Sequence, residues 1–251
     1  MKIENIIKEE YSESESSEVK KINYSSSVSD LISLFEEKYE KLRHTIIEEI
    51  SLRIEEIFET EKSISYHQED ISLFSQTVQQ ESFDHIVLGS FLTELVQFHY
   101  KKNQTKEPYV VFSDDSKGTF SSFGFKLNGP HIKLFGNSGD SLCRKMISGK
   151  IEVYGNVGNI CGGFMEGGEI AIFGNTGRLL GYRMKEGIIR ARSAPKGLVG
   201  FEMENGEIII EEDALSIGSR GTGGIIRIGG NCETIGSPTK TTIYVKGEII
   251  K

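Results

Sequence analysis

Residue types that commonly carry out catalysis or bind metal ions are few in this chain of 251 residues, and they are widely spaced. The five histidines, at positions 44, 67, 85, 99 and 131, show neither the spacing of metal ligands nor a Ser-His-Asp arrangement. Cys143 and Cys161 could be neighbours, but two thiols without a nearby histidine or third cysteine make a poor metal site. For Cys143 and Cys161, burial as small apolar side chains is the commoner role, and a redox pair is the alternative. Cys232 has no cysteine at a corresponding position. The sequence therefore predicts no catalytic residue, no metal ligand and no cofactor.

Two acidic clusters are candidates for a catalytic carboxylate site, namely Glu211-Glu212-Asp213 and Asp114-Asp115. Adjacent acidic residues in a turn usually form a solvated corner, so neither cluster predicts a catalytic site. The recurring Gly-Asn-x-Gly segments look similar to phosphate-binding loops. Their regular recurrence favours structural corners instead.

The clearest cluster of charge is a stretch in which six cationic side chains accompany a single acidic residue, Glu186. These cations are Arg178, Arg183, Lys185, Arg190, Arg192 and Lys196. Arg190 and Arg192 alternate with Ile189 and Ala191, so both are expected to face solvent. Such a stretch is either an ordinary solvated face or a docking surface for an acidic partner, and the acidic half of this chain is one candidate partner.

Charge and glycine are both unevenly distributed. Residues 129–251 carry 15 Lys and Arg against 13 Asp and Glu, whereas the remainder carries 14 against 24, a balance of −10 within the net charge of −8. All 28 glycines follow residue 88, which marks a boundary between two kinds of structure. An acidic chain is a poor match for nucleic acid, and no apolar run approaches the roughly 20 residues that span a bilayer. With no signal-peptide core either, a cytoplasmic protein is expected.

Self-similarity at a fixed period is the strongest signal in the C-terminal half. The anchors Pro130, Gly149, Gly168, Gly187 and Gly206 are each 19 residues apart, and Gly224 follows after 18. The residues two positions after the anchors form one apolar column: Ile132, Ile151, Ile170, Ile189, Ile208 and Ile226. The residues four positions after the anchors form a second: Leu134, Val153, Ile172, Ala191, Ile210 and Ile228. The residues between them are mostly polar, as Lys133 and Glu152 are, which is typical of a β-strand with one buried face.

Two further columns share the same phase. They are Asn137, Asn156 and Asn175, and Met146, Met165, Met184 and Met203. Stacked asparagines can hydrogen-bond neighbouring coils, and asparagine and glycine tolerate the left-handed backbone expected at corners. Methionine fills irregular interior space. We interpret both columns as structural ladders.

These patterns predict a mostly β protein of the α+β class. The expected fold is a right-handed parallel β-helix of about six 19-residue coils, preceded by an α-helical segment. Residues 1–26 are expected to form a flexible acidic and serine-rich arm, residues 27–108 the helical segment, and residues 109–251 the β-helix.

In the helical segment, apolar residues at steps of three and four predict one long helix from about Asp30 to Glu61. Its apolar stripe is Leu31, Phe35, Tyr39, Leu42, Ile46, Ile50, Ile54 and Ile57. A second helix is predicted over Gln68–Gln80, and a third after a Ser82 cap, with Gly89 where another helix approaches closely. The stripe must be covered by the chain's own helices, by a second chain, or by both, so a homo-oligomer is expected.

The segments GNVGNICGGFMEGG and GNTGRLLGYRMKEG resemble the GXGXG repeat domain that ends the large chain of glutamate synthase, and they are similar also to the repeats in one of the subunits of formylmethanofuran dehydrogenase. The resemblance covers roughly residues 130–236, is strongest over Gly149–Gly187, and weakens where Ser193 and Glu212 replace the corner glycine. It implies a domain that braces catalytic domains without contributing a catalytic residue. The nucleophilic cysteine, flavin barrel and iron–sulfur cysteines of glutamate synthase have no counterpart in this sequence.

The expected function is thus a non-catalytic scaffold or docking protein of a larger complex, which the resemblance implies is glutamate synthase-like or formylmethanofuran dehydrogenase-like. Its partners would be other proteins or further copies of itself, with neither nucleic acid nor a membrane involved. A self-associating structural protein is one alternative. An enzyme with an unrecognised surface site on the β-helix is the other.

Overall fold

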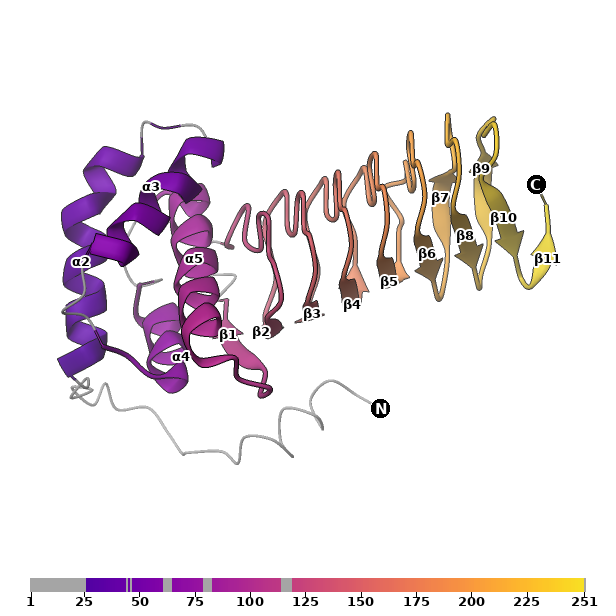
Figure 1. Cartoon of the computed structure of the whole chain (residues 1–251). Coiled ribbons are helices and arrows are strands. Elements are labelled where there is room, and N and C mark those ends of the chain that lie inside the picture. Colours follow the sequence, from indigo (N-terminus) through magenta and orange to yellow (C-terminus); the bar gives the residue numbers. More distant parts are fainter. Residues whose placement is uncertain are drawn as a thin grey trace, which may run out of the picture.

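The computed structural model describes residues 26–43, 45, 47–60, 65–78, 83–113 and 119–250 of the chain. In this part, a group of α-helices is followed by an elongated stack of parallel β-strands (Figure 1). The arm predicted for residues 1–26 lies, except for its last residue, outside the described residues. The predicted combination of a helical segment and a parallel β-helix is confirmed.

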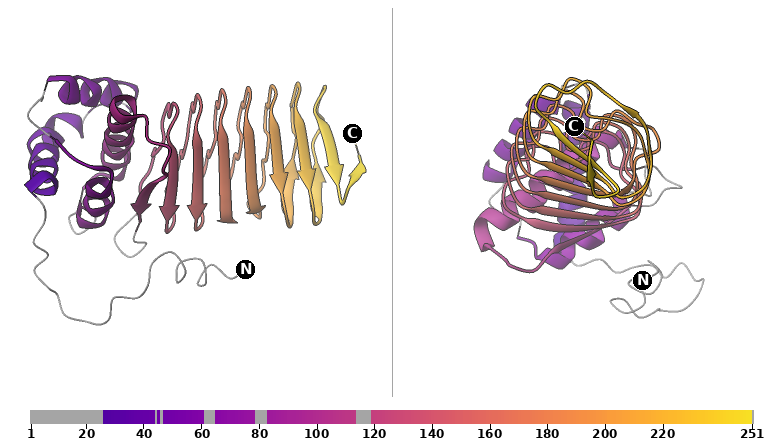
Figure 2. Two further views of the ribbon diagram at one scale, coloured as in Figure 1. Left: turned by 60° about the horizontal axis from the view of Figure 1, so that its bottom comes forward. Right: turned by 90° about the vertical axis from the view of Figure 1, so that its right-hand side faces the viewer.

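The main sheet of the β-helix has the strand order β1-β2-β3-β4-β5-β6-β8-β10-β11 (Figure 2). These strands are β1 Tyr109–Phe112, β2 His131–Phe135, β3 Lys150–Tyr154, β4 Glu169–Asn175, β5 Ile188–Ser193, β6 Glu207–Ile210, β8 Ile225–Ile228, β10 Thr242–Val245 and β11 Glu248–Ile249. A second sheet pairs β7 Ala214–Ile217 with β9 Cys232–Ile235. Strand β1 pairs in parallel with β2, which adds one turn in front of the six predicted coils.

Apolar residues in register form the interior of the coils. The parallel ladder places Ile151 opposite Ile132, and Ile170 between Ile151 and Ile189. All six isoleucines of the first column are fully buried, and the second column is at most 3% exposed, as the period predicts. The four methionines of the 19-residue phase are also fully buried. Since a buried side chain of this size contributes about 1.5–3 kcal/mol, these columns are the main source of the stability of the stack.

Left-handed backbone occurs at the corner glycine Gly136 (φ 106°), as predicted, but it is more frequent elsewhere. It falls on alternate residues of the turns that precede β2 to β6, as at Ser141, Cys143 and Lys145 (φ 63°, 54° and 58°). None of the three corner asparagines adopts it, so that part of the corner prediction is wrong. Gly155 is required for a different reason, because a Cβ there would lie 2.2 Å from the carbonyl oxygen of Gly136 in the preceding coil.

The single long helix predicted for the N-terminal part is instead two helices, α2 (Ser26–Leu42) and α3 (Ile47–Thr60). The chain turns between them at Thr45, whose backbone N–H donates to the carbonyl of Leu42. The Thr45 hydroxyl donates to the carbonyl oxygen of Lys41. The backbone N–H of Thr45 would donate to this same oxygen if the helix continued. A threonine side chain competes with the backbone in this way, and α2 ends three residues before Thr45.

The apolar stripe of α2 and α3 faces the interior of the molecule. Its residues Leu31, Phe35, Leu42, Ile50 and Ile54 are at most 1% exposed. Phe35 packs edge-on against Phe74 of α4 (Gln68–Thr77) and Phe91 of α5 (His85–Asn103). The chain's own helices therefore cover these five residues of the stripe, whereas Ile46 lies outside the described residues. None of the described helices is long and apolar enough to cross a membrane.

Helix α5 lies against the first coil of the β-helix (Figure 2). Its N-cap is Asp84 rather than the predicted Ser82, and the Asp84 carboxylate accepts from two backbone N–H groups of the first helical turn at 2.8 and 3.1 Å. Gly89 does mark a close approach, as predicted, but the neighbour is the first coil and not a helix. A Cβ on Gly89 would lie 2.1 Å from the carbonyl oxygen of Ser121.

Polar side chains of the helices bind the backbone at this end of the β-helix. In α5, Thr93 Oγ1 accepts the N–H of Gly124 at 2.8 Å, and Gln97 Oε1 accepts the N–H of Asn128 at 2.9 Å. In α4, the Ser75 hydroxyl accepts an N–H of β1 at 3.1 Å. The helical segment therefore closes the N-terminal end of the stack, where a bare strand edge would otherwise invite another chain.

Candidate docking surfaces and a polar pocket

The asparagine column joins successive coils through its side chains. Asn137 Oδ1 accepts the backbone N–H of Asn156, and Asn156 Oδ1 accepts the N–H of Asn175 at 2.8 Å. Asn137 and Asn156 thus bind the coil that follows each of them, and these contacts serve the stack itself.

A second column of the same kind mixes aspartate and asparagine. Asp140 Oδ1 accepts the N–H of Asn159 at 2.7 Å, and Asn159 Oδ1 accepts the N–H of Arg178 at 2.9 Å. In later coils the position of the first column, in line with Asn175 and Ser193, is held by Asp213, whose Oδ1 accepts the N–H of Asn231 at 2.6 Å. Sequence reasoning that looked for one recurring residue type missed the second column. The signal in the sequence is the 19-residue spacing of Asp140 and Asn159, two residue types that each have a side-chain oxygen able to accept a hydrogen bond.

Aromatic rings form a third ladder, on the outer face of the main sheet, which was not predicted. Phe112, Phe135, Tyr154 and Phe173 stack in order, with ring centroids 5.6, 4.7 and 4.7 Å apart. The rings of Phe135 and Tyr154 each stack against a neighbouring ring on both faces. Of the four rings, only that of Phe173 is as much as 40% exposed. This ladder therefore supports the stack and offers little free aromatic surface.

The six cations predicted as a docking patch come from three parts of the coil. Arg190 and Arg192 lie on β5, Arg183 and Lys185 in the turn before it, and Arg178 and Lys196 at corners. Four of them pair with carboxylates of neighbouring coils: Arg183–Glu202 at 2.8 Å, Lys185–Glu166 at 2.9 Å, Arg190–Glu169 at 3.8 Å and Arg192–Glu212 at 2.9 Å. Carboxylates of neighbouring coils therefore offset part of the positive charge at four of the six cations, and a docking role for these residues stays a prediction.

The acidic half of the chain does contact cations of the β-helix, but at different residues. Glu48 of α3 lies 3.2 Å from Lys145 and 3.5 Å from Arg144. Partial burial opposes ionisation of Glu48, yet hydrogen bonds from its own backbone N–H and from Lys145 bring the pKa of its carboxyl below its ordinary value. This contact adds an ionic link between the helical segment and the β-helix.

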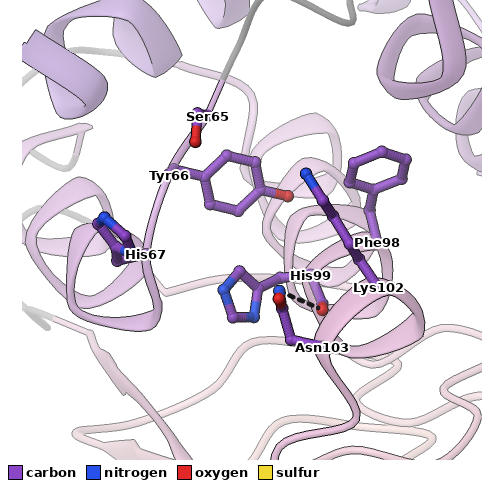
Figure 3. Close-up of a pocket in the computed structure, with 7 residues that line it drawn as sticks. All are labelled: Ser65, Tyr66, His67, Phe98, His99, Lys102 and Asn103. Atoms are coloured by element: carbon purple, nitrogen blue, oxygen red, sulfur yellow. Dashed lines mark hydrogen bonds between the residues drawn. The ribbon is translucent and has the colours of Figure 1, made fainter.

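A polar pocket of about 140 Å³ lies in the helical part, between the segment before α4 and the C-terminal end of α5 (Figure 3). Its lining residues are Ser65, Tyr66, His67, Phe98, His99, Lys102 and Asn103. Sequence reasoning missed this site, because its two segments are more than 30 residues apart and share no motif. Helix packing alone brings them together.

Within the pocket, Tyr109 holds His99 in a defined tautomer. The His99 Nδ1 atom lies 2.8 Å from the hydroxyl of Tyr109, which is fully buried. This nitrogen is the hydroxyl's partner in the described structure, and a buried hydroxyl needs an acceptor, so Tyr109 donates and Nε2 carries the ring proton. Burial, followed by the effect of the neighbouring His67, lowers the pKa of His99 and so favours the neutral ring.

The cysteines lie where they cannot react readily. Cys143 and Cys161 are at most 1% exposed in the interior, and burial raises the pKa of both thiols. Among the described residues, no three His, Cys, Asp or Glu side chains are grouped so that they could hold a metal ion.

The C-terminal end of the β-helix differs from the N-terminal end (Figure 1). It finishes in β11, two residues that pair antiparallel with β10. Here Ile249 and Ile250 are 66% and 45% exposed, and they are adjacent, whereas the other large exposed apolar side chains of the described chain occur singly. Strand β9 has a neighbour on one side only within the described sheets. We call this surface, made of β9, β11 and Ile250, the open end.

Comparisons with known protein families and with curated proteins find no match for this chain.

Proposed function

We propose that this chain is a non-catalytic scaffold or docking protein that assembles a larger protein complex through the open end of its β-helix. The observation that carries this proposal is the contrast between the two ends. The helical segment closes the first coil with hydrogen bonds, whereas the last coils leave strand edges and the Ile249–Ile250 pair in solvent. A partner that adds a strand there would satisfy the edge groups and bury the apolar pair.

The chemistry of the β-helix supports a structural role over catalysis. Its polar columns are used between coils, as in the Asn156–Asn175 contact, and its charged side chains largely form ion pairs between coils. The stack is therefore a stiff support of defined length. The resemblance of its repeats to the bracing domain of glutamate synthase and to the repeats in formylmethanofuran dehydrogenase supports the same role. On that resemblance we propose a complex of this general kind, in the cytoplasm.

Affinity capture of the tagged full chain from its own cells tests the proposal. A protein that co-purifies in stoichiometric amount should be lost when the apolar pair is made cationic, by Ile249→Lys with Ile250→Lys. The matched control is Ile147→Lys, which makes the same change at an exposed apolar residue (43%) away from the open end. Loss of the partner from both variants, or from neither, would contradict docking at the open end.

Self-association is the second candidate, and the open end favours it specifically. Because the described helices close the N-terminal end, two copies would pair open end to open end, which gives a finite two-fold dimer and not a fibre. Light scattering on the purified chain at high concentration separates the two candidates. A dimer that the Ile249→Lys, Ile250→Lys variant abolishes would favour this second candidate, and a monomer would exclude it.

A further inference from the structure

The pocket in the helical segment has the size and the donors of a small-anion site. Its volume of about 140 Å³ is several times the roughly 10–15 Å³ needed to admit one water molecule. In Figure 3, Lys102, Tyr66 and His99 border the same space. A group of four or five heavy atoms fits such a space, whereas a nucleotide or a peptide does not.

The charge of the lining is positive. Lys102 is exposed at the end of α5 and has no ion-pair partner in the described part of the chain. Among the described residues, no carboxylate lines the pocket, although Glu69 in the first turn of α4 has an electrostatic effect on His99. A metal ion would be repelled by Lys102, and an anion would be attracted to it.

The hydrogen-bonding groups of the lining are mostly donors. The Tyr109 contact leaves His99 with its remaining ring proton on Nε2. His67 is exposed on the opposite wall, and Lys102 offers up to three N–H donors. Oxygen atoms of an oxyanion accept such hydrogen bonds, and charge-assisted bonds of this kind are stronger than neutral ones.

We propose that this pocket binds a phosphate group, with Lys102 as the charged contact and His67 and His99 as donors. The group is either free inorganic phosphate or the phosphoryl end of a larger molecule whose remainder extends into solvent. This site is independent of the open end, since the two lie at opposite ends of the molecule (Figure 1).

NMR of the histidine rings in the full chain tests the proposal, with inorganic phosphate as the probe and chloride used to hold the ionic strength constant. Phosphate should shift the ring signals of His67 and His99 saturably, with a dissociation constant on the order of 1 mM. Phenyl phosphate separates the two sources of the group. Tighter binding than that of inorganic phosphate indicates a larger ligand, and equal binding indicates the free anion.

Two matched substitutions make the test specific. Lys102→Gln should weaken binding about tenfold or more, because it removes the charged contact. Lys106→Gln removes the same charge from an exposed residue that does not line the pocket, and should weaken binding less than about twofold. Equal weakening by both variants, or no saturable shift of either ring up to about 20 mM phosphate, would overturn the proposal.

Discussion

Replacing Asn156 tests whether the asparagine column stabilises the coils. In Asn156→Ala, the backbone N–H of Asn175 loses the side-chain oxygen that it contacts at 2.8 Å. One hydrogen bond of this kind contributes about 0.5–1.5 kcal/mol net, so we expect a loss of about 1 kcal/mol and a melting temperature lower by about 2–4 °C. Asn156→Asp is the matched control, because aspartate keeps an acceptor oxygen. Asp140 and Asp213 already use aspartate for the same contact in this protein.

Hydrogen exchange at single amides provides the sharper assay for this substitution. A loss of about 1 kcal/mol in local protection should raise the exchange rate of the Asn175 amide about fivefold in Asn156→Ala. The Thr176 amide, which donates to the carbonyl of Ser193 at 3.0 Å, should change much less. If Asn156→Asp were as destabilised as Asn156→Ala, or if exchange at Asn175 did not change, the assignment of the column as a stabilising ladder would be refuted.

Buried and crowded positions give three further expectations. Ile170→Asp places an unpaired carboxylate in the interior and should cost several kcal/mol, so soluble protein with unchanged calorimetric melting would contradict the interior assignment. Gly89→Ala should lower stability by more than about 1 kcal/mol, because the alanine Cβ would lie 2.1 Å from the Ser121 carbonyl oxygen. Alanine is the better helix former, so a raised melting temperature would refute this expectation. His99, whose neutral form burial favours, should titrate below its ordinary pKa. The contribution of neutral His99 to folding stability is then complete above about pH 6.5 and is lost as the pH falls below that value. An NMR titration that gives an ordinary or raised pKa for His99 would contradict the burial argument.

The β-helix was predictable because its repeat acts directly on backbone pairing. Residues 19 apart, such as Ile151 and Ile170, lie opposite each other in adjacent strands, so spacing in the sequence translates into contact. The same rule applied to charged residues would also have predicted the ion pairs that divide the cationic stretch. Lys185 and Glu166 are 19 apart, as are Arg183 and Glu202.

The helical segment was harder to predict because periodicity alone does not show where a helix ends. The apolar steps continue through residues 43–46, although α2 ends at Leu42 and α3 begins at Ile47. The pocket depends on packing between distant segments, and neither His67 nor His99 carries a local signal of the other. Long-range contacts without a repeat leave no trace in a single sequence.

The most direct test of docking at the open end is cross-linking in the protein's own cells, read by mass spectrometry. Lys240 and Lys246 are exposed near that end, whereas Lys126 is exposed at the end closed by the helices. Docking at the open end predicts cross-links from Lys240 and Lys246 to one other protein and few or none from Lys126. Cross-links to that protein mainly from Lys126, or only links within the chain at all three lysines, would contradict the account.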